Sequence, residues 1–451
     1  MRNLLGSSGV RGTAMEEITP DLCFKSGLAI SSMSRGVYAV GHDVRYTSPL
    51  LAAAFECGLR AGGSDTIVLG LVPTPALAFL SRGLSGGVMI TASHNPPQYN
   101  GFKLFDSSGA SWRPPDYRRL AELAVSSPKY AKWDETGSSN ARSGTWKYLE
   151  WISSRRALGR SWNVGLDPGN GSTSMTASLA FKSAGCGVKA INSHPDPLFK
   201  GRGSEPSASA LSSLSELVRS KGLEIGFAYD GDGDRFAVVD EDGRYLEQDA
   251  ALAFAASMMV KRGRKDVVVN VDTSISVDLL VEKEGGKVHR APVGDVYVLE
   301  SLLKLGASFG GETCGAWIFP DESLCPDGVL SSLLFLSMLE EAGLAPSEVR
   351  RLVPPLYTAR KSVPCSGTDK GALMRSIYDS APGHFQGASV EETDGIRVVL
   401  GDRSWVLIRA SGTEPTIRVT AESEDGAVAH RLVESAAALI IERIGELRRK
   451  E

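Results

Sequence analysis

Three segments of the chain share one local pattern, in which an apolar, strand-like run ends in an aspartate and a turn rich in Gly, Ser or Thr opens a helix-like stretch. The segments are "VYAVGHDVRYTS", "WNVGLDPGNGSTS" and "DVVVNVDTSISVD", with their aspartates at Asp43, Asp167 and Asp272. Their spacing of roughly 105 to 124 residues is that of whole domains, and it is far longer than a solenoid repeat. The pattern therefore predicts three related α/β units in tandem.

Within each unit, apolar runs that favour buried strands alternate with helix-like windows. "DTIVLG", "EIGFAYD" and "DVVVNVD" are of the first kind, and "ALSSLSELVRSKG" is of the second. This alternation is typical of βαβ units with parallel or mixed sheets, which bind ligands at the carboxyl ends of their strands. We expect the three aspartates to lie at those ends.

A fourth, smaller domain is predicted at the C-terminus, because the pattern changes after Pro354 and Pro355. Two strands, "GIRVVLGDRSWVLIRAS" and "PTIRVTAES", precede a long helix from about Gly426 to Arg449. The expected fold class is α/β, with three tandem α/β domains that have mixed sheets, followed by an α+β domain. The expected domains are residues 1–150, 151–247, 248–352 and 353–451.

Charge and composition limit the partners of the chain. A formal net charge of -4 over 451 residues argues against a general binder of nucleic acid or anionic membranes. An anionic ligand would need local clusters of Arg and backbone N–H groups. No run approaches the ~20 apolar residues of a membrane span, and the first residues lack the apolar run of a signal peptide. The six cysteines include no CxxC pair, so we expect a reduced, cytoplasmic setting.

The run "AYDGDGDRFAVVDEDG" places Asp230, Asp232 and Asp234 in alternation with glycines after an apolar strand. Three carboxylates this close repel one another unless a cation compensates them. A hard divalent ion with oxygen ligands, Mg²⁺ above all, fits the set. An EF-hand calcium loop counted from Asp230 would end at Glu241, but Arg235 stands where that loop needs glycine. A solvated acidic turn is the other alternative.

Two loops offer donors to an anion. In "LIRASGTEPTIRVTAES", guanidinium groups, hydroxyls and backbone N–H groups would surround a phosphate group. The residues concerned are Arg409, Ser411, Gly412, Thr413 and Arg418. The Gly-rich "LLGSSGVRG" adds Ser7, Ser8 and Arg11. Taken alone, the first loop could also be a hairpin turn with flanking arginines. The third glycine of a dinucleotide fingerprint is missing from "DPGNGS", and the sequence contains no Walker P-loop.

The segment "ITASHNPPQYNGFKLF" combines Ser93, His94 and Lys103. A hydroxyl, a neighbouring group that takes its proton and a positive charge are the elements of nucleophilic catalysis. There is no GxSxG elbow, which disfavours an esterase. Beside the aspartates and the anion-binding loops, Ser93 fits phosphoryl transfer. Alone, the segment could be a simple turn. In "FGGETCGAWIFP", Glu312 could reach sugar hydroxyls or an amine, or could be a solvated glutamate in a tight turn.

Four motifs, "TASHNPPQYNGFKLF", "DGDGDR", "GETCG" and "RASGTEPTIRV", occur in the order and spacing of the α-D-phosphohexomutase family, with "GSSGVRG" and "VGHDVRYTS" in support. The sequence resembles this family over essentially its whole length. The resemblance implies three related α/β domains and a C-terminal domain similar to TATA-binding protein, placed around a central cleft.

The resemblance also implies which residues carry the chemistry. Ser93 would be the phosphoserine that donates to and accepts from the sugar. Ser93 and the three aspartates of "DGDGDR" would bind Mg²⁺. Arg11 and Lys103 would surround the transferred phosphoryl group, with Lys103 a candidate for proton handling, and His94 is counted among the catalytic residues.

For the substrate, the resemblance implies that Glu312 binds sugar hydroxyls and that the loop from Arg409 to Arg418 holds the non-reacting phosphate. Arg235 and Cys314 are assigned to the same substrate-binding set. The reaction would begin from phosphorylated enzyme, pass through a sugar 1,6-bisphosphate that turns over in the cleft, and return the other phosphomonoester.

Departures from the family pattern bear on the substrate. Cys314, Gly315 and Ala316 stand where many members have Ser-Gly-His, so no role of that histidine can be carried over. His42 stands where an arginine often precedes Asp43. The loop "GGETCGAWIFP" most resembles archaeal members assigned as phosphoglucosamine mutases. We therefore expect interconversion of glucosamine 6-phosphate and glucosamine 1-phosphate, with phosphomannomutase or phosphoglucomutase activity as the alternative. A metal-dependent serine phosphatase and a non-catalytic phosphosugar-binding protein are the hypotheses from other classes.

Overall fold

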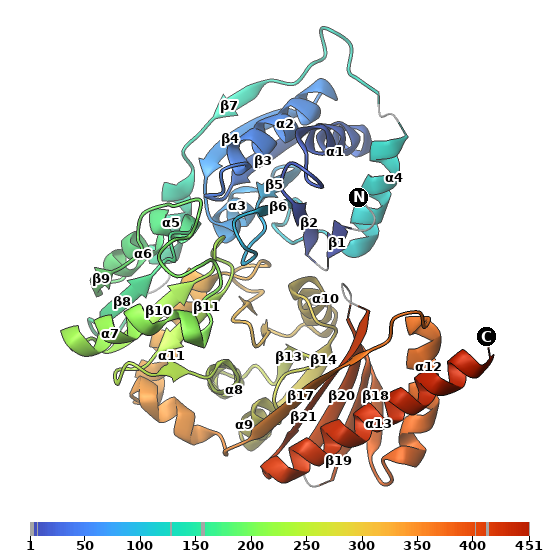
Figure 1. Cartoon of the computed structure of the whole chain (residues 1–451). Helices are drawn as coiled ribbons and strands as arrows, with labels where there is room; N and C mark the ends of the chain where they lie inside the picture. Colours follow the sequence, from blue (N-terminus) through green and yellow to red (C-terminus); the bar gives the residue numbers. More distant parts are fainter. Residues whose placement is uncertain are drawn as a thin grey trace.

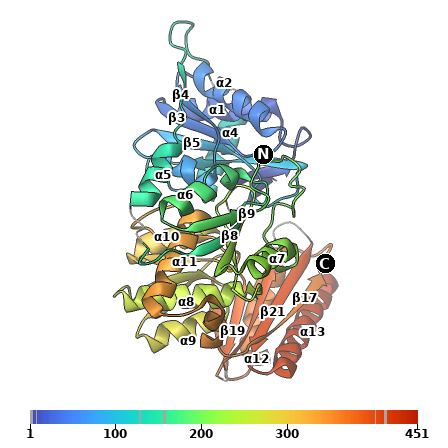
Figure 2. The ribbon, with the colours of Figure 1, turned by 90° about the vertical axis from the view of Figure 1, so that its left-hand side faces the viewer.

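The computed structural model describes residues 4–6, 8–126, 129–154, 158–401, 403–411 and 415–450. Within these ranges, four sheets follow one another along the chain, with seven, five, four and five strands. In Figure 1 the ribbon passes from the blue unit through the green and yellow units to the red one, and Figure 2 shows the same succession from the side. The expected fold class, three α/β domains followed by an α+β domain, is confirmed.

The first sheet has the strand order β1-β2-β6-β5-β3-β4-β7. Strands β3, β4, β5 and β7 are parallel, whereas β1, β2 and β6 are antiparallel to their neighbours. The antiparallel pairing of β5 with β6 places the connecting loop, residues 91–98, at the carboxyl end of β5. The elements are β1 (Leu5–Gly6), β2 (Gly9–Thr13), α1 (Pro20–Met33), β3 (Val37–His42), α2 (Ser48–Ala61), β4 (Asp65–Leu71), α3 (Thr74–Leu80), β5 (Gly86–Ile90), β6 (Tyr99–Phe105), α4 (Pro114–Val125) and β7 (Ser139–Ala141).

Helices α1 and α2 cross closely because glycines stand at the crossing point. A Cβ atom on Gly27 would lie 2.3 Å from the carbonyl oxygen of Phe55, and one on Gly58 would lie 2.0 Å from that of Phe24. Glycine costs about 1 kcal/mol in a helix interior relative to alanine. The close packing of the two backbones explains why glycine is nevertheless present at both positions.

The second sheet has the order β12-β11-β10-β8-β9, with β8, β9 and β10 parallel and β11 and β12 antiparallel. Tyr229 at the end of β10 pairs with Phe236 at the start of β11, so the loop that contains the three aspartates is a tight connection at the carboxyl end of a buried strand. The elements are α5 (Thr145–Ser154), β8 (Asn163–Asp167), η2 (Ser172–Met175), α6 (Ala177–Ser183), β9 (Gly187–Ala190), η3 (Ala208–Ala210), α7 (Ser212–Lys221), β10 (Ile225–Tyr229), β11 (Phe236–Val239) and β12 (Tyr245–Leu246).

The third sheet has the order β14-β13-β15-β16, in which β13 is parallel to both of its neighbours. Helices α8 and α11 are largely apolar around their circumference, and they lie in one core cluster together with side chains of the second sheet. The second and third domains therefore share a core. The elements are α8 (Gln248–Lys261), β13 (Asp266–Asn270), α9 (Ile275–Lys283), β14 (Lys287–Ala291), α10 (Asp295–Leu305), β15 (Phe309–Gly311), β16 (Trp317–Ile318), α11 (Gly328–Ala342) and η4 (Pro346–Leu352).

Taken singly, each helix in the described ranges is too short or too polar to cross a membrane. Helices α11 and η4 meet the length and composition requirement as a pair, but the pair is bent by 76°. The buried side chains of α11 belong to the shared core of the second and third domains.

The fourth sheet is antiparallel throughout, in the order β17-β21-β20-β19-β18, and α12 and α13 pack on it to form a separate core. The expected C-terminal helix is confirmed, but the sheet has more strands than the sequence predicts. Residues 395–411, predicted as one strand, form the two strands β19 and β20 around a turn. The elements are β17 (Tyr357–Pro364), α12 (Lys370–His384), β18 (Ser389–Glu392), β19 (Ile396–Leu400), β20 (Ser404–Ala410), β21 (Thr416–Ser423) and α13 (Gly426–Lys450).

Candidate active site

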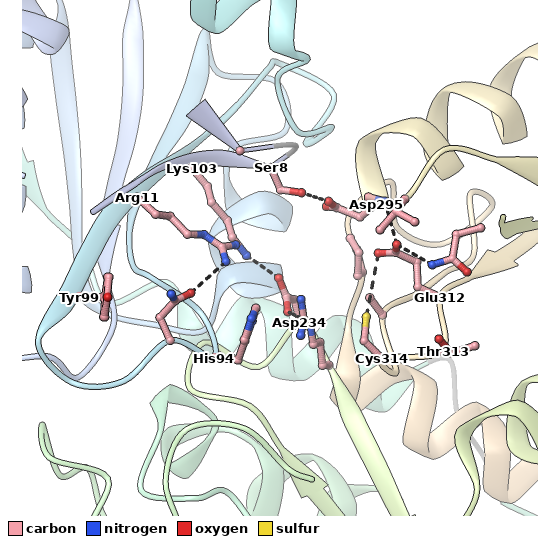
Figure 3. A pocket seen from close by; sticks show the side chains of 18 of the residues that line it. Ser8, Arg11, His94, Tyr99, Lys103, Asp234, Asp295, Glu312, Thr313 and Cys314 are labelled. Atoms are coloured by element: carbon pink, nitrogen blue, oxygen red, sulfur yellow. Dashed lines mark hydrogen bonds and ion pairs between the residues drawn. The ribbon is translucent and has the colours of Figure 1, made fainter. Parts of the chain in front are cut away.

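A cavity of about 610 Å³ lies where the first three domains meet. Figure 3 shows Arg11, Lys103 and His94 on one side of it and Asp295, Glu312 and Cys314 on the other. Strands β2 and β6 supply Arg11 and Lys103, while the loops after β14 and β15 supply the opposite wall. The cavity thus lies at strand ends, where α/β sheets bind ligands.

The three aspartates of the β10–β11 loop form a compact, buried cluster. One ligand oxygen from each of Asp230, Asp232 and Asp234 lies within 4.8 Å of the others. Burial and the neighbouring carboxylates raise the pKa of Asp230 and of Asp234. Asp232 Oδ1 and Asp234 Oδ1 are buried without a hydrogen-bond partner. Buried carboxylate oxygens without hydrogen-bond partners, in this arrangement, fit a hard divalent cation.

Lys103 is the cation that compensates part of this cluster in the structure. Its Nζ donates to Asp232 Oδ2 at 2.9 Å and also to Asp234 Oδ2. Burial alone would lower the pKa of Lys103, but the two carboxylates outweigh it and hold the pKa above its usual value. Burial would likewise raise the pKa of Asp232, but Lys103 reverses the direction. Lys103 is therefore a charged partner of the aspartates in this arrangement.

Ser93 faces the aspartate cluster and is buried, with 1% of its surface exposed. Its Oγ donates to Asp230 Oδ2 at 2.8 Å and lies 3.4 Å from His94 Nδ1. Burial, followed by the charges of Arg235 and Arg11, lowers the pKa of His94 to about 2, so its imidazole is neutral. Ser93 itself lies behind the cavity lining, and His94 forms part of that lining.

Two arginines extend the positive side of the cavity. Arg11 Nη1 lies 3.4 Å from Asn95 Oδ1, on the same loop as Ser93. Arg235 lies 3.5 Å from Glu205 and 4.0 Å from Asp234. Guanidinium groups with donors directed into a cavity are well suited to phosphate.

The opposite wall centres on Glu312, which is 6% exposed. Its Oε1 accepts hydrogen bonds from Asn270 Nδ2 at 3.1 Å and from the Gly294 backbone N–H at 2.8 Å. Burial and the nearby Asp295 raise the pKa of Glu312 to about 7. Cys314 Sγ lies 4.0 Å from Glu312 Oε2, and burial raises the pKa of this thiol to about 12. The thiol is therefore uncharged at neutral pH.

The predicted phosphate-binding loop lies beside this cavity. Arg409 and Arg418 line a second hollow of about 310 Å³, which shares Asp272 with the lining of the first. Arg409 Nε donates to Asp394 Oδ2 at 2.8 Å. The backbone of Ser411 pairs with Thr416 at the start of β21. Gly412 and Thr413 lie outside the described residues.

The structure brings most of the predicted residues together and adds others that the motifs did not indicate. Thr74 Oγ1 donates to Asp232 Oδ2 at 2.7 Å, and Ser8 Oγ donates to Asp295 Oδ1 across the cavity. Asp295 begins helix α10, four residues after the end of β14, so it does not follow the strand-end pattern of Asp43, which comes directly after β3. Thr74 has no such pattern either. The assigned roles of the site residues stay predictions.

Profiles of the phosphoglucomutase/phosphomannomutase family match four consecutive parts of the chain. They correspond to α/β/α domain I at residues 2–130, α/β/α domain II at 147–243, α/β/α domain III at 247–357 and the C-terminal domain at 363–439. A "Probable phosphoglucosamine mutase" from Pyrococcus horikoshii is 38% identical over 452 residues, which cover 99% of this chain and 100% of the relative.

Solved structures are similar over the same length. A phosphoglucomutase/phosphomannomutase family protein from Burkholderia thailandensis has a TM-score of 0.89 at 26% identity, covering 99% of this chain and 98% of that chain. An N-acetylphosphoglucosamine mutase from Aspergillus fumigatus, in complex with GlcNAc-6P and magnesium, has a TM-score of 0.65 at 16% identity, covering 97% of this chain and 95% of that chain, and shows the fold alone. Together with the full-length identity to the archaeal relative, these matches establish that the chain belongs to the phosphoglucomutase/phosphomannomutase, or α-D-phosphohexomutase, family.

Proposed function

We propose that this phosphohexomutase interconverts glucosamine 6-phosphate and glucosamine 1-phosphate, with Ser93 as the phosphoryl carrier and Mg²⁺ held by Asp230, Asp232 and Asp234. The name of the Pyrococcus horikoshii relative supports the amino sugar. The Aspergillus fumigatus complex with GlcNAc-6P and magnesium is consistent with a phosphosugar ligand and with this ion. The alternative within the family is phosphoglucomutase or phosphomannomutase activity.

The observation that carries the choice of an amino sugar is the division of charge in the cavity. The cationic residues of its lining are Arg11, Lys103 and Arg235, from the first two domains, which also contribute the carboxylates of Glu17 and Asp234. The third domain contributes the carboxylates of Asp272, Asp295 and Glu312 and, among the described residues, no Lys or Arg. A ligand with phosphate on one side and an ammonium group on the other complements both walls. Glucose and mannose phosphates have a neutral hydroxyl in place of the amine, and would leave these carboxylates without a counter-charge.

Each half-reaction moves one phosphoryl group between Ser93 Oγ and a sugar oxygen. In the first, the bond from phosphorus to Ser93 Oγ breaks, a bond to the free sugar hydroxyl oxygen forms, and Ser93 Oγ gains a proton in place of the one that the sugar hydroxyl loses. In the second, the sugar bisphosphate binds in the opposite orientation, the bond from its other phosphorus to the sugar oxygen breaks, a bond to Ser93 Oγ forms, and the sugar oxygen gains a proton in place of the one that Ser93 loses. Arg11 and Arg235 would hold the phosphoryl oxygens. The metal, when bound, supplies charge neutralisation at the transferred group.

The contact of Ser93 with Asp230 gives the phosphorylated state a physical consequence. The Ser93 hydroxyl donates a hydrogen bond to Asp230 Oδ2 in the unphosphorylated structure. A phosphorylated serine has no such proton, so Asp230 loses its donor just as negative charge is added beside it. A divalent cation between the two groups would restore the balance.

The deciding measurement is kcat/KM for glucosamine, glucose and mannose 1-phosphates, each with the matching 1,6-bisphosphate as activator. We expect glucosamine 1-phosphate to be preferred by at least ~10-fold. A preference for mannose or glucose 1-phosphate would reverse the assignment. Intact-mass analysis is expected to detect one phosphate on the wild type and none on Ser93→Ala. Release of free phosphate at the rate of substrate loss, with no isomer formed, would indicate a phosphatase instead.

A further inference from the structure

Arg45 lies at the centre of the Ser93 loop although the two are far apart in the sequence. It follows β3, and its side chain is completely buried. Its Nε donates to Asp43 Oδ2 at 3.0 Å. Each of its two terminal nitrogens donates two further hydrogen bonds, all to backbone carbonyl oxygens of the Ser93 loop or of the first residue of β6. All five N–H donors of the guanidinium group are therefore used.

The four carbonyl oxygens define the path of the loop. Nη2 donates to Ser93 O at 2.8 Å and to Asn95 O at 2.6 Å. Nη1 donates to Pro96 O at 2.6 Å and to Tyr99 O at 3.0 Å. A planar guanidinium group can bind acceptors on both of its terminal nitrogens at once, whereas a lysine has three donors on one nitrogen. The loop is thus built around a group that lysine cannot replace.

Ser93 is held from its amide side as well. Its backbone N–H donates to Thr91 Oγ1 at 2.8 Å, and Thr91 Oγ1 donates to Asp43 Oδ2 at 2.8 Å. Asp43 therefore connects to Ser93 through Thr91 at the amide and through Arg45 at the carbonyl. The φ angle of Ser93 is +52°, in the left-handed region that residues other than glycine seldom occupy. Such a conformation persists only when the surroundings determine it from several sides.

Two residues of the second domain contact Arg45 and the Ser93 loop. The ring of Phe199 lies 5.1 Å from Arg45 Cζ. Ser204 Oγ donates to His94 O at 2.6 Å and to Asn95 O at 2.9 Å. The Ser93 loop is therefore held by the first domain, which also contains Lys103, and by the second domain, which contains the aspartate cluster.

We propose that Arg45 is a positioning residue for phosphoryl transfer, which holds the strained Ser93 backbone so that Oγ points at the aspartate cluster. Arg45 does not touch the reacting atoms. This inference rests on the proposed role of Ser93 as phosphoryl carrier. It predicts that Arg45 affects the rate of transfer much more than the binding of the sugar phosphate, because the cavity lining itself does not include it.

The test compares Arg45→Lys, which keeps the charge, with Thr91→Val, which removes the hydroxyl link at nearly constant volume. Arg350→Lys is the matched control, because Arg350 also combines carboxylate and carbonyl partners, but these partners, Glu247, Asp240 and Tyr245 O, lie outside the Ser93 loop. For each protein we would measure kcat, KM, the thermal midpoint and the rate at which glucose 1,6-bisphosphate phosphorylates Ser93, followed by intact mass.

We expect Arg45→Lys to lower kcat and the phosphorylation rate by ~100-fold, while KM changes by less than about threefold. Thr91→Val should act in the same direction, and Arg350→Lys should keep the wild-type kcat. The inference about Arg45 would be overturned if either variant kept the wild-type kcat and phosphorylation rate. It would also be overturned if the losses were no larger than the loss of folded protein seen by circular dichroism. Neither outcome would affect the proposed function. A wild type that takes up no phosphate on Ser93 would overturn the proposed function as well.

Discussion

The protonation of Glu312 makes the free energy of unfolding depend on pH. Its pKa rises from 4.5 to about 7, so the folded protein holds this proton more tightly than the unfolded chain does. The resulting stabilisation is complete below about pH 4.5 and is lost as the pH rises through about 7. Above that pH the buried carboxylate costs at most about 3 kcal/mol relative to a neutral group.

Glu312→Gln should therefore raise the thermal midpoint at pH 8 more than at pH 5. The amide oxygen of glutamine can still accept from Asn270 and Gly294, so the fold keeps these contacts. Thermal unfolding of both proteins at the two pH values measures the effect. Glu216→Gln, at an exposed helix position, serves as control and should show no pH-dependent difference. Equal shifts at pH 5 and pH 8 for Glu312→Gln would contradict the prediction.

Lys103 and the proposed divalent cation would compete for the same two carboxylates. Because Lys103 Nζ donates to Asp232 and Asp234, its removal leaves these groups with an unmet negative charge. We expect Lys103→Met to bind Mg²⁺ at least ~10-fold more tightly than the wild type in calorimetric titration, while its mutase activity falls. Asp230→Asn should do the opposite and weaken Mg²⁺ binding. Weaker binding by Lys103→Met would show that the lysine supports the metal site instead of competing with it.

Local motifs indicated the residue types of this site better than they indicated their partners. The runs around Ser93 and Asp230 each carry a recognisable pattern. The contact between Lys103 and Asp232, however, joins strand β6 of the first domain to a loop of the second domain, and no local pattern indicates such a contact. Arg45 was missed for a related reason. Its acceptors are backbone carbonyls, which every residue has, so no side-chain pattern marks them.

At the scale of single elements, the crossing of α1 and α2 depends on glycine. A Cβ at Gly58 would lie 2.0 Å from Phe24 O, and backbone atoms cannot move aside cheaply. Gly58→Ala should therefore destabilise the protein by about 1–3 kcal/mol. Gly445→Ala, in the open on α13, should instead stabilise it by about 0.4–1 kcal/mol. Urea unfolding of the two variants checks the sign, and a stabilising Gly58→Ala would refute the packing argument.

The sequence patterns predicted the order of elements more reliably than their ends. The run of residues 395–411 has no Pro and only one internal glycine, Gly401, so it resembles a single strand. The chain nevertheless reverses after Leu400, with Arg403 at φ +61°, and forms the β19–β20 hairpin. The cross-strand partners decide this outcome: Val398 and Val406 pair across the hairpin and both enter the core under α12 and α13. Periodicity alone does not show which residues pair.

At the scale of the whole molecule, the core with the most buried side chains crosses a domain boundary. One cluster of buried side chains runs through the second and third domains and also includes Ala76 of the first. The fourth domain has its own larger cluster, formed by its sheet and by α12 and α13, and a small cluster of Trp405, Leu407 and Val271 joins it to the third domain. Side chains within one core lose their packing together, so the second and third domains should unfold as one unit, and the fourth domain separately.

Two large-to-small substitutions test this division. Leu333→Ala, in α11, opens a cavity in the shared core, and Ile377→Ala, in α12, opens one in the core of the fourth domain, since both side chains are fully buried. Each should cost about 2–5 kcal/mol in the unit that contains it. Hydrogen exchange followed by mass spectrometry should show faster exchange in peptides of both the second and third domains for Leu333→Ala. For Ile377→Ala it should be faster only in peptides after about residue 357, because the fourth sheet begins there. If each variant accelerated exchange equally over the whole chain, the four domains would unfold as a single cooperative unit, and the fourth domain would not unfold separately despite its own core.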